Sequence, residues 1–434
     1  SGNWDDNTGT LSYGLGSHQV RMRGSGTVSQ DPSNVFRNLQ IENGLYTAAS
    51  DINIVQNFNI GTSGSSGQFD VSTFTIHHQA SGGNRIFIDN GTLFFNGNGT
   101  LNSDAAFDAS GGTITFNAAG TLKLAALNSD LGSSFSPGAG TVEYDLAGDQ
   151  NIFNTTYNNL EIDGSGDKDV GANLTVGDSL TITNGTLDLT NGGVGNFELA
   201  LTGDFSMAAG SLLAGTSDAH TVGGSWSETG GTFTPTAGTF TFNNGVGTIT
   251  QFAGNNFNNL TVSAGTKTAA SDLKIDGALL IDQATSVLDM SVSNFTLDVG
   301  GDLTISNNGT FTPQGSTTHD VLGSWNDAGG TFTPGAGTII LSGDGKTITT
   351  AAGNNFFNLT IAAGTKTAGS DLDVNGALLI DPGTLDMDVA NNYTLDLEGD
   401  LTISNNGTFT PQGSTTHDVL GSWNDAGGTF TPGA

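Results

Sequence analysis

The stretch that decides the fold, residues 301–336, reads GDLTISNNGTFTPQGSTTHDVLGSWNDAGGTFTPGA and returns letter for letter at residues 399–434. The two copies are offset by 399 − 301 = 98 residues. A looser copy upstream ends in Trp226, at the place of Trp325 and Trp423. Exact repetition at a fixed distance indicates a tandem array of structural units, in which each unit packs mainly on its neighbours.

Phenylalanine positions mark the long repeat. Phe135, Phe233, Phe332 and Phe430 follow one another at steps of 98, 99 and 98 residues. They divide the chain into units of approximately 1–134, 135–232, 233–331 and 332–429, and residues 430–434 begin a further unit. The first unit is longer, which predicts an irregular insertion of about one extra turn within residues 60–125. We expect all units to belong to one continuous domain over residues 1–434.

A shorter period lies inside each unit. Phe311 and Phe332 sit in equivalent Gly-Thr-Phe-Thr-Pro runs, at an offset of 332 − 311 = 21 in the sequence. Runs such as Leu303-Thr-Ile305 alternate apolar and polar residues, which is typical of half-buried strands. Gly- and Asn-rich segments between the runs are turn signals. The pattern predicts an all-β parallel β-solenoid with about 20–21 residues per coil and about five coils per repeat. A right-handed coil is expected from the general bias of parallel β connections.

Composition limits the partners. The chain has 10 basic and 42 acidic residues, a net charge of −32, and no cysteine. Such a chain is expected to repel nucleic acid and anionic membranes, and it cannot form disulfides or thiolate metal sites. No apolar run approaches the roughly 20 residues of a membrane span. The chain opens at Ser1 without a signal-peptide pattern, so we expect a processed or excised segment of an exported, extracellular or cell-surface protein.

Three segments and their copies carry a family resemblance: residues 255–262, residues 272–281 and residues 301–305. In pattern the chain resembles the long repetitive β-helical surface proteins of bacteria, such as filamentous-haemagglutinin-like adhesins and giant cell-surface repeat proteins. The resemblance covers nearly the whole chain. It implies an elongated, extracellular protein that is not an enzyme.

The repeated His-Asp-Val-Leu-Gly-Ser-Trp segment holds the candidate binding residues. These are Trp226, Trp325, Trp423, His319 and His417. Exposed tryptophans would offer a stacking surface for carbohydrate. The alternative is structural: each tryptophan packs at a corner of the coil and each histidine caps a turn.

Aspartates suggest a structural calcium site, for which Asp386 and Asp388 are the candidates because alternation places both on one strand face. The alternative is that they are turn residues and outward-facing strand residues. No other cofactor is expected.

Asparagine sequons are candidates for glycosylation in a secreted protein. The repeat supplies Asn259, Asn308, Asn358 and Asn406.

Together these observations predict a structural subunit or segment of an extracellular filament, stalk or surface fibre. Its partners would be other copies or neighbouring repeats, end to end. The alternative is an adhesin or glycan-binding spike, with glycans or cell surfaces as partners. A third reading is a polysaccharide-degrading enzyme, for which the irregular region with His77, His78, Arg85 and Asp89 is the place to look.

Overall fold

The computed structural model describes residues 2–5, 18–79, 83–217, 219–313, 315, 317–388, 391–411 and 415–432. The described residues contain strands and turns and no helix, and the strand ladders are parallel. The coils form a β-solenoid of about 19 turns, which confirms the predicted fold class. By contacts the chain divides into unit 1, Ser1–Gly215 with Gly230–Thr232, and unit 2, Thr216–Thr229 with Phe233–Ala434.

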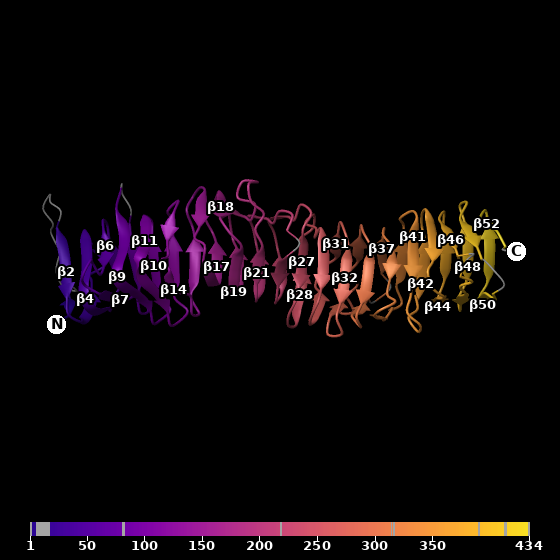
Figure 1. Cartoon of the computed structure of the whole chain (residues 1–434), viewed down its shortest axis with the longest axis horizontal. Helices are drawn as coiled ribbons and strands as arrows, with labels where there is room; N and C mark the ends of the chain where they lie inside the picture. The colour runs from indigo at the N-terminus through magenta and orange to yellow at the C-terminus, as the bar shows by residue number, and fades with distance from the viewer. Residues whose placement is uncertain are drawn as a thin grey trace. The chain divides into compact units, whose positions relative to one another are not determined.

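Unit 1 contains three parallel ladders, whose strands follow one another in chain order (Figure 1). The first comprises β1 (Trp4–Asp5), β2 (Gln19–Arg23), β3 (Gly26–Ser29), β4 (Asn38–Ala48), β6 (Phe58–Ile60), β7 (Gly67–Asp70), β9 (Arg85–Phe95), β11 (Ala106–Phe116), β13 (Ser129–Asp130) and β14 (Ser134–Ser136). The second comprises β5 (Ile52–Ile54), β8 (Thr75–His78), β10 (Thr100–Ser103), β12 (Thr121–Leu124), β15 (Thr141–Tyr144), β17 (Thr156–Ile162), β19 (Leu174–Ile182), β21 (Leu199–Leu201) and β22 (Asp204–Met207). The third comprises β16 (Gln150–Ile152), β18 (Asp167–Val170), β20 (Thr186–Asp188) and β23 (Ser211–Leu213). Strand β26 (Thr232–Thr234) spans the boundary between the two residue ranges.

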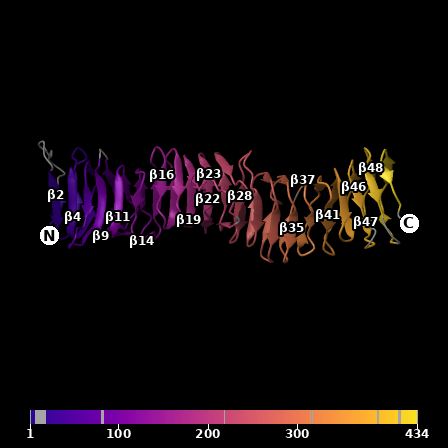
Figure 2. The same ribbon diagram turned by 45° about the horizontal axis from the view of Figure 1, so that its top comes forward.

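Unit 2 also has three faces, which we call ladders A, B and C; Figure 2 shows several of their strands in a turned view. Ladder A comprises β24 (His220–Val222), β27 (Thr239–Phe242), β29 (Asn259–Val262), β32 (Leu279–Asp282), β35 (Leu303–Ser306), β38 (Trp325–Asn326), β41 (Lys346–Thr349), β43 (Thr365–Ala368), β46 (Thr384–Asp386), β49 (Thr408–Thr410) and β52 (Thr429–Phe430). Ladder B comprises β25 (Trp226–Glu228), β28 (Gly247–Thr250), β30 (Thr266–Ala269), β33 (Val287–Asp289), β36 (Thr310–Thr312) and β39 (Thr331–Phe332), and then β44 (Leu372–Val374), β47 (Leu395–Leu397) and β50 (Asp418–Val419). Ladder C comprises β31 (Leu273–Ile275), β34 (Leu297–Val299), β37 (Thr318–Val321), β40 (Thr338–Leu341), β42 (Asn358–Ile361), β45 (Leu378–Ile380), β48 (Leu401–Ser404) and β51 (Trp423–Ala426).

Apolar columns fill the interior of each unit. In ladder A, Leu260 pairs with Leu279, Leu279 with Leu303, and Leu303 with Trp325, and all four side chains are fully buried. The residues between them on each strand point outward, as the alternation in sequence predicted. Burying each such aliphatic side chain contributes about 1.5–3 kcal/mol, so the stacked columns are the main source of stability.

A long repeat does not close on a whole number of turns. The equivalent strands β29 and β42 begin 358 − 259 = 99 residues apart, at Asn259 and Asn358. We count each strand as one position along the coil, and the isolated bridge at Phe356 as one more. On this count β29 and β42 are fourteen positions apart, and three positions, one on each face, make one turn. One repeat therefore makes four turns and two thirds, in agreement with the expected value of about five coils per repeat. Identical copies consequently lie a third of a turn apart: Trp325 is in ladder A and Trp423 is in ladder C.

The first repeat contains one more turn. Leu39 and Leu160, which occupy equivalent Asn-Leu pairs, are seventeen strand positions apart. The long strands β4, β9, β11 and β17 count as two positions each in this number, because the two halves of each strand lie on different faces. The count is three positions, or one turn, more than the fourteen of the repeat in unit 2. The extra turn accounts for the greater length of the first repeat. Its placement within residues 60–125 stays a prediction; in that range Thr75 pairs with Thr100 at a sequence offset of 100 − 75 = 25.

Aspartates end several of the strands, and one further aspartate, Asp108, lies inside the long strand β11. In each case a backbone N–H two residues further on donates to the aspartate Oδ1, at 2.6–3.1 Å. This hydrogen bond closes an Asx turn and directs the chain around the corner of the coil. The aspartates that do this are Asp70, Asp108, Asp130, Asp188, Asp289 and Asp386.

Candidate functional site

The candidate tryptophans Trp226 and Trp325 lie in the core of unit 2 and are fully buried. The indole of Trp226 packs 5.0 Å from the ring of Phe233 and 5.2 Å from that of Phe257. Trp325 packs 4.7 Å from Phe332 in the same way. Aromatic neighbours thus occupy the ring faces that a sugar would need. The structure places these two rings in the scaffold, which corrects the interpretation of them as a surface platform.

A buried carboxylate fixes each of these tryptophans. The indole N–H of Trp325 donates to Oδ2 of Asp327 at 3.0 Å, and the backbone N–H of Ala351 in the next coil donates to Oδ1 at 2.8 Å. Asp327 is fully buried, and burial raises the pKa of its carboxyl group. We call this arrangement the corner latch. The carboxyl group of Asp327 links the two coils, because it accepts the indole N–H of its own coil and the backbone N–H of the next coil.

The preceding repeat builds the same latch with a longer side chain. The indole N–H of Trp226 donates to Glu228 Oε1 at 2.8 Å, and Phe252 N and Asn255 Nδ2 donate to Oε2 at 3.1 and 2.9 Å. Burial raises the pKa of Glu228 as well. The sequence signal for the latch, an acidic residue two positions after each of these tryptophans, was visible in all three copies.

Trp423 occupies a different environment from its copies. It lies in β51, which pairs with β48 through Leu401, and it is 45% exposed. Asp425, the counterpart of Asp327, is exposed. The sequence of this segment is identical to that around Trp325, which also pairs with Ile348 of β41, so the surroundings and not the local sequence distinguish the buried ring from the exposed one.

The candidate histidines accept hydrogen bonds from neighbouring strands. Nδ1 of His319 accepts the backbone N–H of Leu297 at 3.2 Å, and Nδ1 of His417 accepts that of Leu395 at 3.1 Å. His319 is buried, and desolvation lowers its pKa to about 4, so the ring is neutral near pH 7. These contacts are structural.

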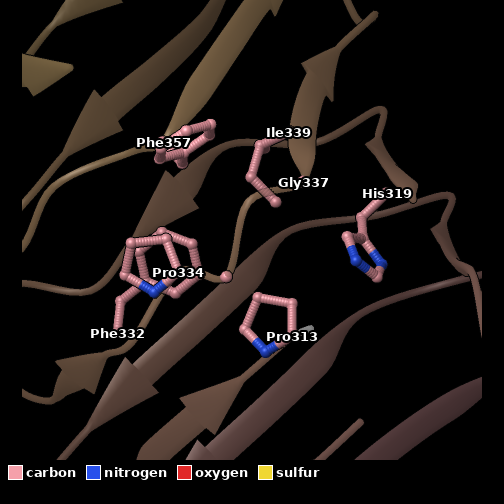
Figure 3. A pocket seen from close by; sticks show the side chains of 8 residues that line it. Pro313, His319, Phe332, Pro334, Gly337, Ile339 and Phe357 are labelled. Atoms are coloured by element: carbon pink, nitrogen blue, oxygen red, sulfur yellow. The ribbon is translucent and has the colours of Figure 1, made fainter. Parts of the chain in front are cut away.

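The cavity beside His319 is small (Figure 3). Its labelled lining includes Pro313, Phe332, Pro334 and Phe357. The volume of about 10 Å³ is room for about one water molecule. The cavity therefore cannot hold a sugar or another organic ligand.

The calcium candidates Asp386 and Asp388 serve the turn after β46. Oδ1 of Asp386 accepts the backbone N–H of Asp388 at 3.1 Å, and Oδ2 of Asp388 accepts Nδ2 of Asn391 at 2.8 Å. Asp388 lies beyond the end of the strand with φ of 57°, so the two carboxylates do not share a strand face as expected. Within the described part of the chain, no group of three or more His, Asp or Glu side chains is placed to hold a metal ion.

The four sequon asparagines fall into two environments. Asn308 and Asn406 are exposed in turns, with φ of 64° and 67°. Asn259 and Asn358 are half-buried at the starts of β29 and β42, and their Oδ1 atoms accept backbone N–H groups of the next coil at 2.9 and 2.8 Å. Of the four, Asn308 and Asn406 are therefore the accessible candidates for modification.

The irregular region around β8 and β9 combines buried and exposed polar residues. His78 is buried and hydrogen-bonds to the carbonyl oxygen of Gln56, and burial lowers its pKa. Arg85 lies 3.5 Å from Asp108 and 4.1 Å above the ring of Phe87. These contacts hold neighbouring strands together. The candidates His77, His78, Arg85 and Asp89 are distributed over these two strands, with His77 and His78 on β8 and Arg85 and Asp89 on β9.

Buried lysines are structural residues that the sequence analysis missed. Lys168, Lys267 and Lys366 recur at steps of 267 − 168 = 99 and 366 − 267 = 99 and are fully buried. The ammonium group of Lys267 donates to the carbonyl oxygens of Gly223, Gly224 and Asn244, each at 2.8 Å.

The carbonyl groups at these turns explain the burial. Nζ of Lys168 donates to three carbonyl oxygens, at 2.6–3.0 Å, although desolvation lowers its pKa. Tyr46 stands at the same place in the first repeat and donates its hydroxyl to the carbonyl of Arg23 at 3.1 Å. The side chain at this position of the repeat must donate hydrogen bonds to the carbonyl groups that converge there. The regular spacing of the three lysines was the sequence signal that could have indicated this structural role.

A comparison with protein-family models, curated proteins and solved structures finds no match for this chain. The resemblance to filamentous-haemagglutinin-like proteins therefore stays a prediction. Among the described residues there is no helix long and apolar enough to cross a membrane.

Proposed function

We propose that this chain is a structural segment of an extracellular filament, stalk or surface fibre. The observation that carries the proposal is the interchangeability of the repeats. Residues 301–336 and 399–434 are identical, and ladders A and C of unit 2 pass through both copies with continuous parallel pairing. A chain built from such units changes its length by whole repeats and keeps its cross-section.

The rotation between successive repeats, a third of a turn, supports the same role. Because one repeat makes four turns and two thirds, equivalent surfaces are presented in three directions in succession. A scaffold that meets its surroundings on all sides suits this arrangement. The net charge of −32 would keep neighbouring segments apart by mutual repulsion and would favour a soluble, extended state.

A variant with one added repeat tests the mechanical part. Duplication of residues 301–398 is expected to lengthen the particle by about 22 Å, since four turns and two thirds rise by about 4.8 Å each. The cross-section should stay the same. Small-angle scattering and electron microscopy of the parent chain and the extended chain measure both quantities. An unchanged length with a larger cross-section would contradict the proposal.

Localisation needs a separate test. Antibodies against the chain, applied to intact producing cells and to the same cells after permeabilisation, should label both equally. Labelling only after permeabilisation would exclude the extracellular role.

A further inference from the structure

A groove of about 760 Å³ opens on unit 2, and no tryptophan is among the residues that line it. Its lining includes the turn that contains Phe252, the segment with Phe295 and Asp298, and Lys274 of β31. Ligand sites in proteins typically have volumes of about 300–1,000 Å³, so the groove is large enough for a small ligand.

Part-buried and exposed hydrogen bonds hold the lining in place. The side chain of Gln251 bridges the backbone of Lys274: its Nε2 donates to the carbonyl at 3.0 Å and its Oε1 accepts the N–H at 2.7 Å. The backbone N–H of Phe252 donates to the buried Glu228 at 3.1 Å. In the adjoining part of the lining, the N–H of Thr296 donates to Asp272 Oδ1 at 2.7 Å. The groove is therefore organised before a ligand arrives, which lowers the entropic cost of binding.

Three side chains of the groove face solvent: the aromatic ring of Phe252, the ammonium group of Lys274 and the carboxylate of Asp298. Phe252 is 41% exposed. Nζ of Lys274 lies 3.8 Å from Oδ2 of Asp298, and these two side chains are 53% and 47% exposed. An aromatic ring packs against the C–H face of a sugar, while an ammonium and a carboxylate at this spacing can donate to and accept from adjacent hydroxyl groups.

From this geometry we infer that the groove binds a neutral oligosaccharide. The chain's charge of −32 disfavours acidic glycans and other polyanions. The lining mixes amide, hydroxyl and charged groups with two aromatic rings, which is more polar than a site for a lipid or an apolar peptide. This binding activity goes beyond the proposed scaffold role and does not depend on it.

The next repeat provides an internal comparison. At the positions of Phe252, Lys274 and Asp298 it carries Ala351, Asp373 and Asp396. The ring and the cation are replaced, and burial together with Asp396 raises the pKa of Asp373. The two repeats share the same strand pairing, as β31 pairs with β34 and β44 pairs with β47. The same backbone thus offers the proposed site in one repeat and not in the next.

The first test exchanges these residues. Hexasaccharides of β-1,4-glucose, α-1,4-glucose, β-1,4-mannose and β-1,4-N-acetylglucosamine are titrated into the full chain by calorimetry. We expect saturable binding of at least one probe with one site per chain. The variant Phe252→Ala/Lys274→Asp should lose affinity at least about tenfold. Failure of all four probes to bind, or an unchanged affinity in the variant, would overturn the inference.

The second test adds a site. The variant Ala351→Phe/Asp373→Lys introduces the ring and the cation into the next repeat and leaves the first groove intact. The stoichiometry for the same probe should rise from one to two per chain. A folded variant, as judged by circular dichroism, that still binds one equivalent would contradict the assignment of these residues. Tighter binding of an acidic hexasaccharide than of the neutral probe would contradict the ligand class.

Discussion

The corner latch provides a sharp prediction because its two identical sequence copies lie in different environments. Asp327 is buried and accepts the indole N–H of Trp325 and the backbone N–H of Ala351. Asp425 is its exact sequence counterpart and is exposed. Replacement of each by alanine therefore changes the same local sequence and isolates the contribution of burial.

The expected magnitude follows from the two donors. In Asp327→Ala both N–H groups lose their acceptor inside the core, at a cost of about 1–3 kcal/mol each. Removal of a buried carboxylate offsets part of this loss, so we expect a net destabilisation of about 2–3 kcal/mol. Asp327→Asn keeps one acceptor oxygen and should lose about 1 kcal/mol. Asp425→Ala should stay within about 0.5 kcal/mol of the parent.

Native-state hydrogen exchange is the suitable assay, because a repeat protein need not unfold in a single step. The free energy of opening is measured for amides of residues 325–351 in the two Asp327 variants and of residues 423–432 in Asp425→Ala, and urea unfolding by circular dichroism gives the stability of the whole chain. Equal losses in Asp327→Ala and Asp425→Ala would refute the reasoning, since they would show that the carboxylate acts through local sequence and not through the coil that covers it.

Three further predictions concern a buried lysine, a buried histidine and the two tryptophans Trp325 and Trp423. Lys267→Met should destabilise the chain by about 2 kcal/mol in urea unfolding, because three carbonyl oxygens lose their donor. The control Lys274→Met, at the surface, should have little effect, and equal effects of the two substitutions would contradict the role of the buried ammonium. The pKa of His319, lowered to about 4, makes its contribution to stability complete above about pH 6.5 and progressively lost as the pH falls toward 4, by up to about 3 kcal/mol. His319→Gln should remove that component, so a stability difference between parent and variant that does not change from pH 7 to pH 4 would contradict it. Trp423→Phe should remove more iodide-quenchable fluorescence than Trp325→Phe, and the opposite order would contradict the burial of the two rings.

The sequence predicted the fold well because the information is local and repeated. Alternation in runs such as Leu303-Thr-Ile305 correctly indicated which side chains face inward. The echo between Phe311 and Phe332 correctly indicated one coil, since these residues pair directly in ladder B. The hand of the coil stays a prediction.

The sequence shows only an average coil length, because the turns differ in length. The paired residues Thr141 and Asn159 have a sequence offset of 159 − 141 = 18, whereas the paired residues Thr75 and Thr100 have an offset of 100 − 75 = 25. Division of the 98-residue repeat by the 21-residue coil gives about 4.7 coils, the value that strand pairing gives as four and two thirds. Rounding to about five coils concealed the missing third of a turn, so the shift of one face between copies was not predicted.

The sequence left two interpretations of the tryptophans and histidines open, because their burial depends on a neighbouring coil; the structural interpretation holds for Trp226 and Trp325. A tryptophan and a histidine in a Gly- and Ser-rich segment have the composition of a surface motif, yet Trp325 and His319 are in the core. Buried lysine is rare, so residue type alone gave no indication that Lys168 and its copies lie in the core. The groove around Phe252 and Lys274 is assembled from successive coils, so its residues are not adjacent in sequence.

Cysteine cross-linking measures the register of the coils most directly, because the chain has no natural cysteine. In ladder C, Asp298 pairs with Asp320, and Asp320 pairs with Ile340 one coil further on. Adjacent parallel strands are about 4.8 Å apart, within the Cα range of a disulfide, whereas positions two coils apart are separated by about 9.6 Å. The variant Asp298→Cys/Asp320→Cys should form an intramolecular disulfide on mild oxidation, and Asp298→Cys/Ile340→Cys should not. Failure of the first pair to form the bond, or equal cross-linking of the second, would contradict the stacked parallel coils on which the account rests.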